Sequence, residues 1–165
     1  AQKGESKSSE FLRETLFGWL PHYSTPAHPL NRTGEATSTI VGGNLSVLTS
    51  LVGTPYDILK PGKILFIEDI NEPLYKIERM LYTLKFSGVL GSLKGLVVGN
   101  FEGCRENAAF GGSIYDIIRR MVEEYDYPVC FGFPAGHGEE CYPIIEGATA
   151  SLKIETEGVE IAFCS

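Results

Sequence analysis

The sequence lacks any apolar run close to the roughly 20 residues that cross a bilayer as a helix, and its first residues lack the apolar core of a signal peptide. It also has few basic residues: 14 Lys and Arg stand against 21 Asp and Glu, for a formal charge of −7. Because affinity for nucleic acids depends on clustered Lys and Arg, this balance argues against a nucleic-acid partner. We therefore expect a soluble, globular protein that binds neither membranes nor nucleic acids.

Cysteine motifs are also missing. The four cysteines are widely separated and form no Cys-x-x-Cys pair; they are Cys104, Cys130, Cys141 and Cys164. Neither a zinc site nor a redox motif is therefore indicated, and we interpret each cysteine as a small buried apolar residue. His137 and Cys141, four residues apart, could share a metal, but the sequence offers no second pair of ligands. We predict no metal site.

The first 41 residues show no sustained periodicity and contain several prolines and a polar run from Asn31 to Thr39. Such a stretch is typical of a long loop, so residues 1–41 are predicted to be a partly irregular leader between domains. Apolar residues between Phe11 and Leu20 indicate one short helix within it. Regular patterns begin at Gly42, and we place the compact domain, with one hydrophobic core, at residues 42–165.

The compact region alternates between strands and helices. Near-continuous apolar runs predict three strands buried on both faces, as in a parallel sheet: residues 62–68, 96–99 and 129–132. The tail reads as an antiparallel hairpin of residues 148–154 and 159–163. We therefore predict an α/β fold of three layers, with a central parallel sheet and a second, antiparallel layer.

Helix start signals precede the amphipathic segments between these strands. Asn44 is predicted to cap a short helix, and Asn71, followed by Pro73, to cap a longer one that ends at Gly88. Ser113 and Asp116 have the spacing of a capping box, which predicts the start of a third helix.

Two groups that move or hold protons follow predicted strands. Glu68 ends the first strand, and His137 lies in a glycine-flanked loop after the third. Ligands gather beyond the carboxyl ends of parallel strands, so both residues lie at the edge where a site is expected. His22 and His28 fall in the irregular leader, which leaves His137 as the plausible general base. A carboxylate and an imidazole are two of the three groups of a hydrolytic triad.

Both residues also have a purely structural interpretation. Glu68 and Asp69 can simply leave the sheet toward water, with Asp69 favouring the dipole of the next helix. His137 can be a surface residue whose neighbours, Gly136 and Gly138, let the backbone approach another group closely.

Five motifs occur in order along the chain: Gly42-Gly43-Asn44-Leu45-Ser46, Gly53-Thr54-Pro55-Tyr56, Ile67-Glu68-Asp69-Ile70-Asn71-Glu72-Pro73, Gly99-Asn100-Phe101-Glu102-Gly103-Cys104 and Gly132-Phe133-Pro134-Ala135-Gly136-His137. Together they resemble the C-terminal half of the LD-carboxypeptidases, serine peptidases that include murein tetrapeptide carboxypeptidase and the microcin C self-immunity peptidase. The resemblance covers about residues 42–163.

The resemblance implies a two-domain enzyme with a Ser-Glu-His triad, whose C-terminal domain has a swivelling β/β/α fold. Carried over by motif, the glutamate is Glu68, which orients the imidazole, and the histidine is His137, which acts as base and then acid. Asp69 is a rival for the orienting role, because a shift of one residue in a strand reverses the direction of the side chain.

The nucleophile of the family is not found in this sequence. A serine in a sharp turn after a strand, as in the first domain of the family, is absent, and Ser46 is the least implausible internal candidate. We therefore expect this chain to be a fragment or excised domain without the serine domain, and to have no peptidase activity alone. The oxyanion hole would also come from the missing domain, and no cofactor is needed.

Three polar residues are candidate substrate contacts. The Asn44 amide can bond a peptide or carboxylate if its loop faces the cleft, although helix capping explains it equally well. Asp69 and Asn71 lie in the acidic loop after Glu68, which would suit an amine-bearing stem peptide, although exposed acids are commonly just a solvated face.

The resemblance favours a cytoplasmic enzyme that cleaves between a diamino acid and a terminal D-alanine in peptidoglycan peptides during murein recycling. A peptidyl-nucleotide antibiotic is the alternative substrate. The alternative from another class is a noncatalytic swivelling domain that binds a partner. Exposed apolar residues are expected where the first domain docks, and the resemblance also implies a homodimer.

Overall fold

The computed structural model describes residues 7–104 and 112–164. In that part of the chain the helices are α1 (Lys7–Leu16), α2 (Leu45–Leu51), α3 (Leu74–Phe86) and α4 (Ile114–Met121), with a short 3₁₀-helix at Leu90–Ser92. The strands are β1 (His22–Pro26), β2 (Gly34–Asn44), β3 (Ile64–Ile70), β4 (Gly95–Glu102), β5 (Val129–Cys130), β6 (Thr149–Ile154) and β7 (Gly158–Cys164).

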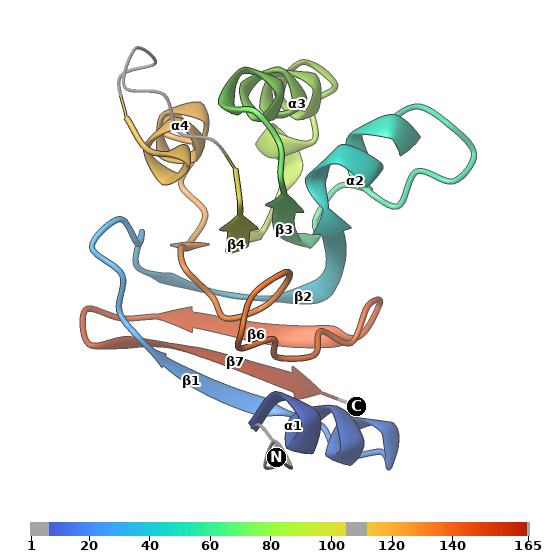
Figure 1. The fold of residues 1–165 in the computed structure, drawn as a ribbon, viewed down its shortest axis with the longest axis vertical. Coiled ribbons are helices and arrows are strands. Elements are labelled where there is room, and N and C mark those ends of the chain that lie inside the picture. The colour runs from blue at the N-terminus through green and yellow to red at the C-terminus, as the bar shows by residue number, and fades with distance from the viewer. Residues whose placement is uncertain (1–6, 105–111, 165) are drawn as a thin grey trace.

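The strands lie in the order β1-β7-β6-β2-β3-β4-β5. Neighbours from β2 to β5 are parallel, whereas β1, β7, β6 and the first half of β2 form an antiparallel group. β2 belongs to both groups, since residues 34–39 pair with β6 and residues 40–44 pair with β3. Figure 1 shows β2 running along the antiparallel strands and then turning toward α2.

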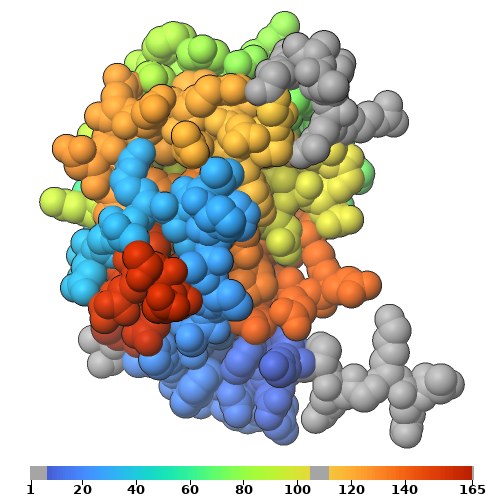
Figure 2. Space-filling model, turned by 90° about the vertical axis from the view of Figure 1, so that its left-hand side faces the viewer, coloured from blue at the N-terminus to red at the C-terminus, as the bar shows by residue number. Residues whose placement is uncertain are grey.

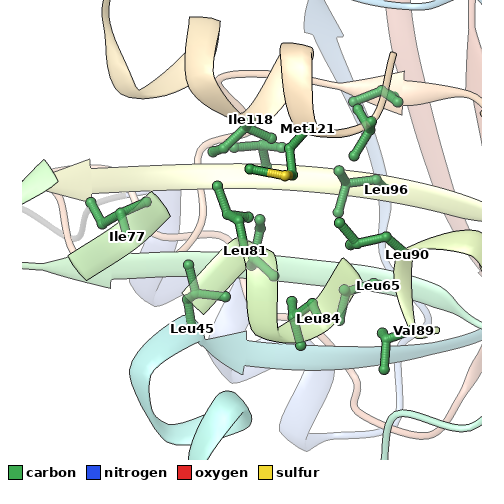
Figure 3. Close-up of a cluster of buried hydrophobic side chains, with 14 of the residues drawn as sticks. Leu45, Leu65, Ile77, Leu81, Leu84, Val89, Leu90, Leu96, Ile118 and Met121 are labelled. Carbon is green, nitrogen blue, oxygen red and sulfur yellow. The ribbon is translucent and has the colours of Figure 1, made fainter. Parts of the chain in front are cut away.

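Alternate residues of β3 pack in two different hydrophobic clusters. Leu65 and Ile67 lie in the cluster between the parallel strands and helices α2, α3 and α4, shown in Figure 3. Ile64 and Phe66 lie in a second cluster against β6 and β7. Burial on both faces explains the continuous apolar run of this strand. The three layers are therefore helices, parallel strands and antiparallel strands, and the predicted α/β fold class is confirmed.

The prediction of an irregular leader is wrong for much of residues 22–41. β1 pairs with β7 over its whole length, and β2 begins at Gly34, so the predicted boundary at Gly42 falls inside a strand. Pro26 concealed β1, but it occupies the last position of a strand at the end of the sheet order, where a missing N–H costs no ladder bond. The polar residues of β2 concealed its alternation of exposed and less exposed positions.

The segment between β1 and β2 is also held to the domain. Figure 2 shows it, in blue, lying between the α4 side of the molecule and the β6–β7 turn. Arg32 donates hydrogen bonds to the carbonyl oxygens of Val122 at 2.9 Å, Tyr127 at 3.3 Å and Tyr125. These carbonyls belong to residues that follow α4, so Arg32 ties the segment to the end of this helix.

The predicted helix starts are confirmed at two of three caps. The Asn44 side chain accepts from Val47 N at 3.1 Å to cap α2, and Ser113 and Asp116 form the capping box of α4. The cap predicted at Asn71 is wrong, because α3 begins after Pro73. The short helix predicted between Phe11 and Leu20 corresponds to α1, which starts earlier. None of the described helices is long and apolar enough to traverse a membrane.

Candidate catalytic site

Glu68 and His137 come from two elements that meet at the carboxyl end of the parallel strands. Glu68 lies near the end of β3, and its side chain is almost completely buried. β5 ends at Cys130, earlier than predicted, and the chain then forms the irregular segment that carries His137. The histidine side chain is half exposed. The prediction that both residues lie at the same edge is confirmed by their contact.

The two side chains make a direct hydrogen bond. His137 Nδ1 lies 2.7 Å from Glu68 Oε2, and the backbone N–H of His137 donates to the same oxygen at 3.3 Å. An ionised carboxylate only accepts hydrogen bonds, so this contact places the imidazole proton on Nδ1 and leaves the lone pair on Nε2. A histidine in this tautomer can accept a proton at Nε2, as a general base must.

Gly136 allows the loop to approach the glutamate. Its φ is +96°, in the left-handed region, and a Cβ at this position would lie 2.6 Å from Glu68 Cβ. Both facts require glycine. The preceding Ala135 accepts a hydrogen bond from Asn100 N at 3.0 Å, which ties the loop to β4. The predicted close approach beside His137 is confirmed.

Asp69 faces away from His137. Its carboxylate accepts from Asn44 Nδ2 at 2.8 Å, from Ser46 N at 3.1 Å and from the N–H of Ile70 at 2.8 Å. The side chain is buried at the start of α2, where a negative charge interacts favourably with the helix dipole. The contact with the imidazole is therefore made by Glu68 and not by its rival. The backbone contact of Ser46 had no signal in the sequence.

The structure accounts for Asn44 within the fold. Its Oδ1 caps α2 and one N–H of its amide donates to Asp69, so a second N–H is left for another partner. Asn71 adopts a φ of +58° in the turn between β3 and α3, a conformation that asparagine tolerates better than most residues. Its N–H donates to Glu102 O at 2.9 Å.

Several serines other than Ser46 have structural partners. The hydroxyls of Ser38, Ser50, Ser87 and Ser92 donate to backbone carbonyls, and that of Ser113 bonds Asp116. Ser46 lies in the first turn of a helix, not in a sharp turn after a strand. Among the described residues, two of the three groups of a candidate hydrolytic triad are therefore identified, Glu68 and His137.

The cysteines differ from one another. Cys130 is buried, and burial raises the pKa of its thiol to about 12. Cys141 and Cys164 are exposed, so the interpretation as buried apolar residues is wrong for them. Within residues 7–104 and 112–164, no three His, Cys, Asp or Glu side chains are grouped closely enough to hold a metal ion.

A family model, described as the LD-carboxypeptidase C-terminal domain, matches residues 37–152. The chain belongs to this family. The match begins within β2 and ends within β6, so it includes both Glu68 and His137. The resemblance drawn from the five motifs is thereby confirmed.

Two of the proteins similar to this chain are named carboxypeptidases, and a third is named a self-immunity protein. A probable murein peptide carboxypeptidase of Bacillus subtilis is 38% identical over 87% of this chain and 44% of its own length. The Microcin C7 self-immunity protein MccF of Escherichia coli is 26% identical over 78% of this chain and 38% of its own length. The crystal structure of muramoyltetrapeptide carboxypeptidase from Oxalobacter formigenes matches 99% of this chain and 57% of its own, with a TM-score of 0.88 and 27% identity. This LD-carboxypeptidase C-terminal domain thus spans about half the length of these proteins.

Proposed function

We propose that the chain supplies Glu68 and His137 of a Ser-Glu-His triad in an LD-carboxypeptidase that removes the terminal D-alanine from murein tetrapeptides. The hydrogen bond of 2.7 Å between His137 Nδ1 and Glu68 Oε2 carries this proposal. Membership of the LD-carboxypeptidase C-terminal domain family and the names of the relatives support it. The serine and the oxyanion hole would belong to a preceding domain, because the chain spans only about half of these relatives.

Each member of the pair has a defined role in this proposal. Nε2 of His137 takes the proton of the attacking serine and later returns it to the leaving D-alanine amine. Glu68 holds the tautomer with the proton on Nδ1 and stabilises the imidazolium that forms. Its burial keeps water from competing for the hydrogen bond, and the second bond from the backbone of His137 fixes the ring relative to the carboxylate.

For the substrate, we propose Asn44 as the contact and Asp69 as its support. The remaining N–H of the Asn44 amide can donate to a peptide carbonyl or carboxylate. Asp69, fully buried and bonded to Asn44, sets the direction of that amide. The predicted contacts of Asp69 and Asn71 with substrate stay predictions, as does the peptidyl-nucleotide alternative, since the described contacts do not distinguish the two substrates.

The decisive experiment measures D-alanine release from a murein tetrapeptide. The chain alone is expected to release none. The full-length protein, meaning this chain with the serine domain that we propose precedes it, is expected to be active and to lose activity on His137→Ala. The matched control, Glu139→Ala, changes an exposed neighbour in the same loop. Unchanged activity in His137→Ala, or hydrolysis by the chain alone, would contradict the proposal and favour a noncatalytic domain or another nucleophile.

We further propose that the protein is a cytoplasmic homodimer. The four cysteines are unpaired, as is usual in a reducing compartment. Leu12, Leu16 and Phe17 of the N-terminal segment are half or more exposed, which favours association with a second copy. Sedimentation over a wide concentration range is expected to show a dimer, and a strictly monomeric profile of the full-length protein would overturn the assignment.

A further inference from the structure

We propose that Tyr142 is a positioning residue for His137, held in place by aromatic side chains from α1 and β1. The inference rests on the proposed function of His137 as the general base. Tyr142 takes no part in the hydrogen bonds between Glu68 and His137. It acts instead on the loop that carries the histidine. The observations that support it are the closure of that loop, the packing of the Tyr142 ring and the contacts of α1.

The His137 loop is closed by a backbone hydrogen bond at its base. Tyr142 N donates to Pro134 O at 2.7 Å, so residues 134–142 form a loop whose two ends meet. The residue before this loop is tied to β4, because Phe133 N donates to Val98 O at 3.0 Å. Residues 137–141 are exposed. Because little of this exposed part is packed, its anchored ends limit how far the loop moves and so support the hydrogen bonds that His137 makes to Glu68.

The ring of Tyr142 is the packed anchor of the second end. Its centroid lies 5.0 Å from that of Phe11, 5.0 Å from that of Tyr23 and 6.1 Å from that of Phe133. The Phe11 and Phe133 rings meet it edge-on, which is a favourable geometry for aromatic pairs. The three rings come from α1, β1 and the start of the loop, so one side chain joins three parts of the chain.

Two hydrogen bonds beside Tyr142 hold the same end of the loop. The hydroxyl of the buried Tyr23 donates to Pro143 O at 3.0 Å, next to Tyr142. Cys141 N donates to Ser8 Oγ of α1 at 2.9 Å. No residue of α1 is itself buried, and the Ser8 hydrogen bond and the Phe11 ring attach the helix to this loop. α1 therefore covers the anchor.

Loss of this anchor should lower the catalytic rate by displacing the His137 imidazole. The hydrogen bond to Glu68 is 2.7 Å long, and a loop freed at its base can move the imidazole by an ångström without unfolding the domain. Displacements of about 1 Å in a catalytic group can lower rates on the order of 100-fold. The substrate site itself would be intact, so the effect belongs in kcat and not in KM.

The test compares Tyr142→Ala with Tyr142→Phe in the full-length protein. Tyr142→Ala is expected to lower kcat by roughly 10- to 100-fold with KM changed little, and Tyr142→Phe, which keeps the ring, is expected to retain most of the activity. Phe11→Ala, which removes a ring from the other side, should lower kcat less, and the double variant with Tyr142→Ala should be no worse than Tyr142→Ala alone.

A matched control separates positioning from general destabilisation. Tyr125→Ala removes a partly buried ring that stacks on Tyr127 near the end of α4, away from the loop, and should leave kcat unchanged. The protonated Nδ1 signal of the His137 ring in an NMR spectrum should shift or broaden in Tyr142→Ala and not in Tyr125→Ala. Equal kcat and an unaltered His137 signal in Tyr142→Ala would overturn the inference.

The outcome also distinguishes this inference from the proposed function. If His137→Ala abolishes activity while Tyr142→Ala is fully active, only the positioning role fails. If His137→Ala is itself active, the proposed function fails, and the NMR signal of His137 still reports whether Tyr142 holds the loop.

Discussion

Glu68 and Asp69 are consecutive residues of β3 whose carboxylates serve opposite layers of the fold. Glu68 bonds His137 on the side of the antiparallel strands and the loop after β5, whereas Asp69 bonds Asn44 and the start of α2 on the helical side. Successive side chains of a strand point to opposite faces, so one pair of acids can hold both the imidazole and the helix.

Glu68→Gln should impair catalysis without unfolding the domain. The glutamine keeps the size of the side chain but loses the charge that stabilises the imidazolium. Because its amide can donate to Nδ1 as well as accept from it, it also no longer selects one tautomer of His137. In the full-length protein we expect kcat to fall by roughly 100- to 10,000-fold with a small change in KM. Steady-state release of D-alanine measures both parameters. A comparable fall in the exposed control Glu140→Gln would show that a loss of negative charge, and not the hydrogen bond, is responsible.

Gly136→Ala should be far more harmful than Gly147→Ala. Both glycines have a positive φ, +96° and +82°, so both substitutions carry the cost of a left-handed residue, about 1 kcal/mol. A Cβ at Gly147 meets open space, whereas one at Gly136 collides with Glu68. Urea unfolding should therefore show a larger loss of stability for Gly136→Ala. Equal losses would mean that the loop moves away from Glu68 without cost.

Asn44→Ala and Asp69→Ala should be strongly coupled. Either change removes the hydrogen bond between the ends of β2 and β3, and each leaves a buried or half-buried polar group without this partner, at a cost of about 1–3 kcal/mol. The double variant should lose less stability than the sum of the two single variants, since the shared bond can be lost only once. A double-mutant cycle by chemical denaturation measures this coupling, and strict additivity would contradict the contact.

Asp116 should contribute to stability at neutral pH and not in strong acid. Hydrogen bonds from the hydroxyl and backbone N–H of Ser113 hold the pKa of this carboxyl below its ordinary value of 3.8. A carboxyl whose pKa is lower in the folded state stabilises the protein above the unfolded pKa, and this contribution is lost as the pH falls through the folded pKa. The stability difference between wild type and Asp116→Asn should thus shrink below about pH 3.8. A constant difference down to the lowest accessible pH would exclude this linkage.

Sequence patterns located the helices and central strands where a single local rule applied. The run at residues 64–67 was recognised because a strand buried on both faces is apolar throughout, and the capping box at Ser113 because its spacing is local. β1 was missed because its pairing partner, β7, lies more than a hundred residues away in the chain. The cap predicted at Asn71 was wrong because Asn71 lies in a turn with a positive φ, and the N-cap of the helix is Pro73, two residues later.

The sequence by itself determined the fold class, the family motifs and the two residues, Glu68 and His137, that carry the candidate chemistry. Only the tertiary structure decided that these two side chains meet, that Asp69 turns to the other layer, and that Tyr142 anchors the histidine loop between rings from α1 and β1. The physical reason is the range of the interactions. Periodicity and capping act within a few residues, whereas these contacts join residues distant in sequence, and their geometry exists only after the layers have packed.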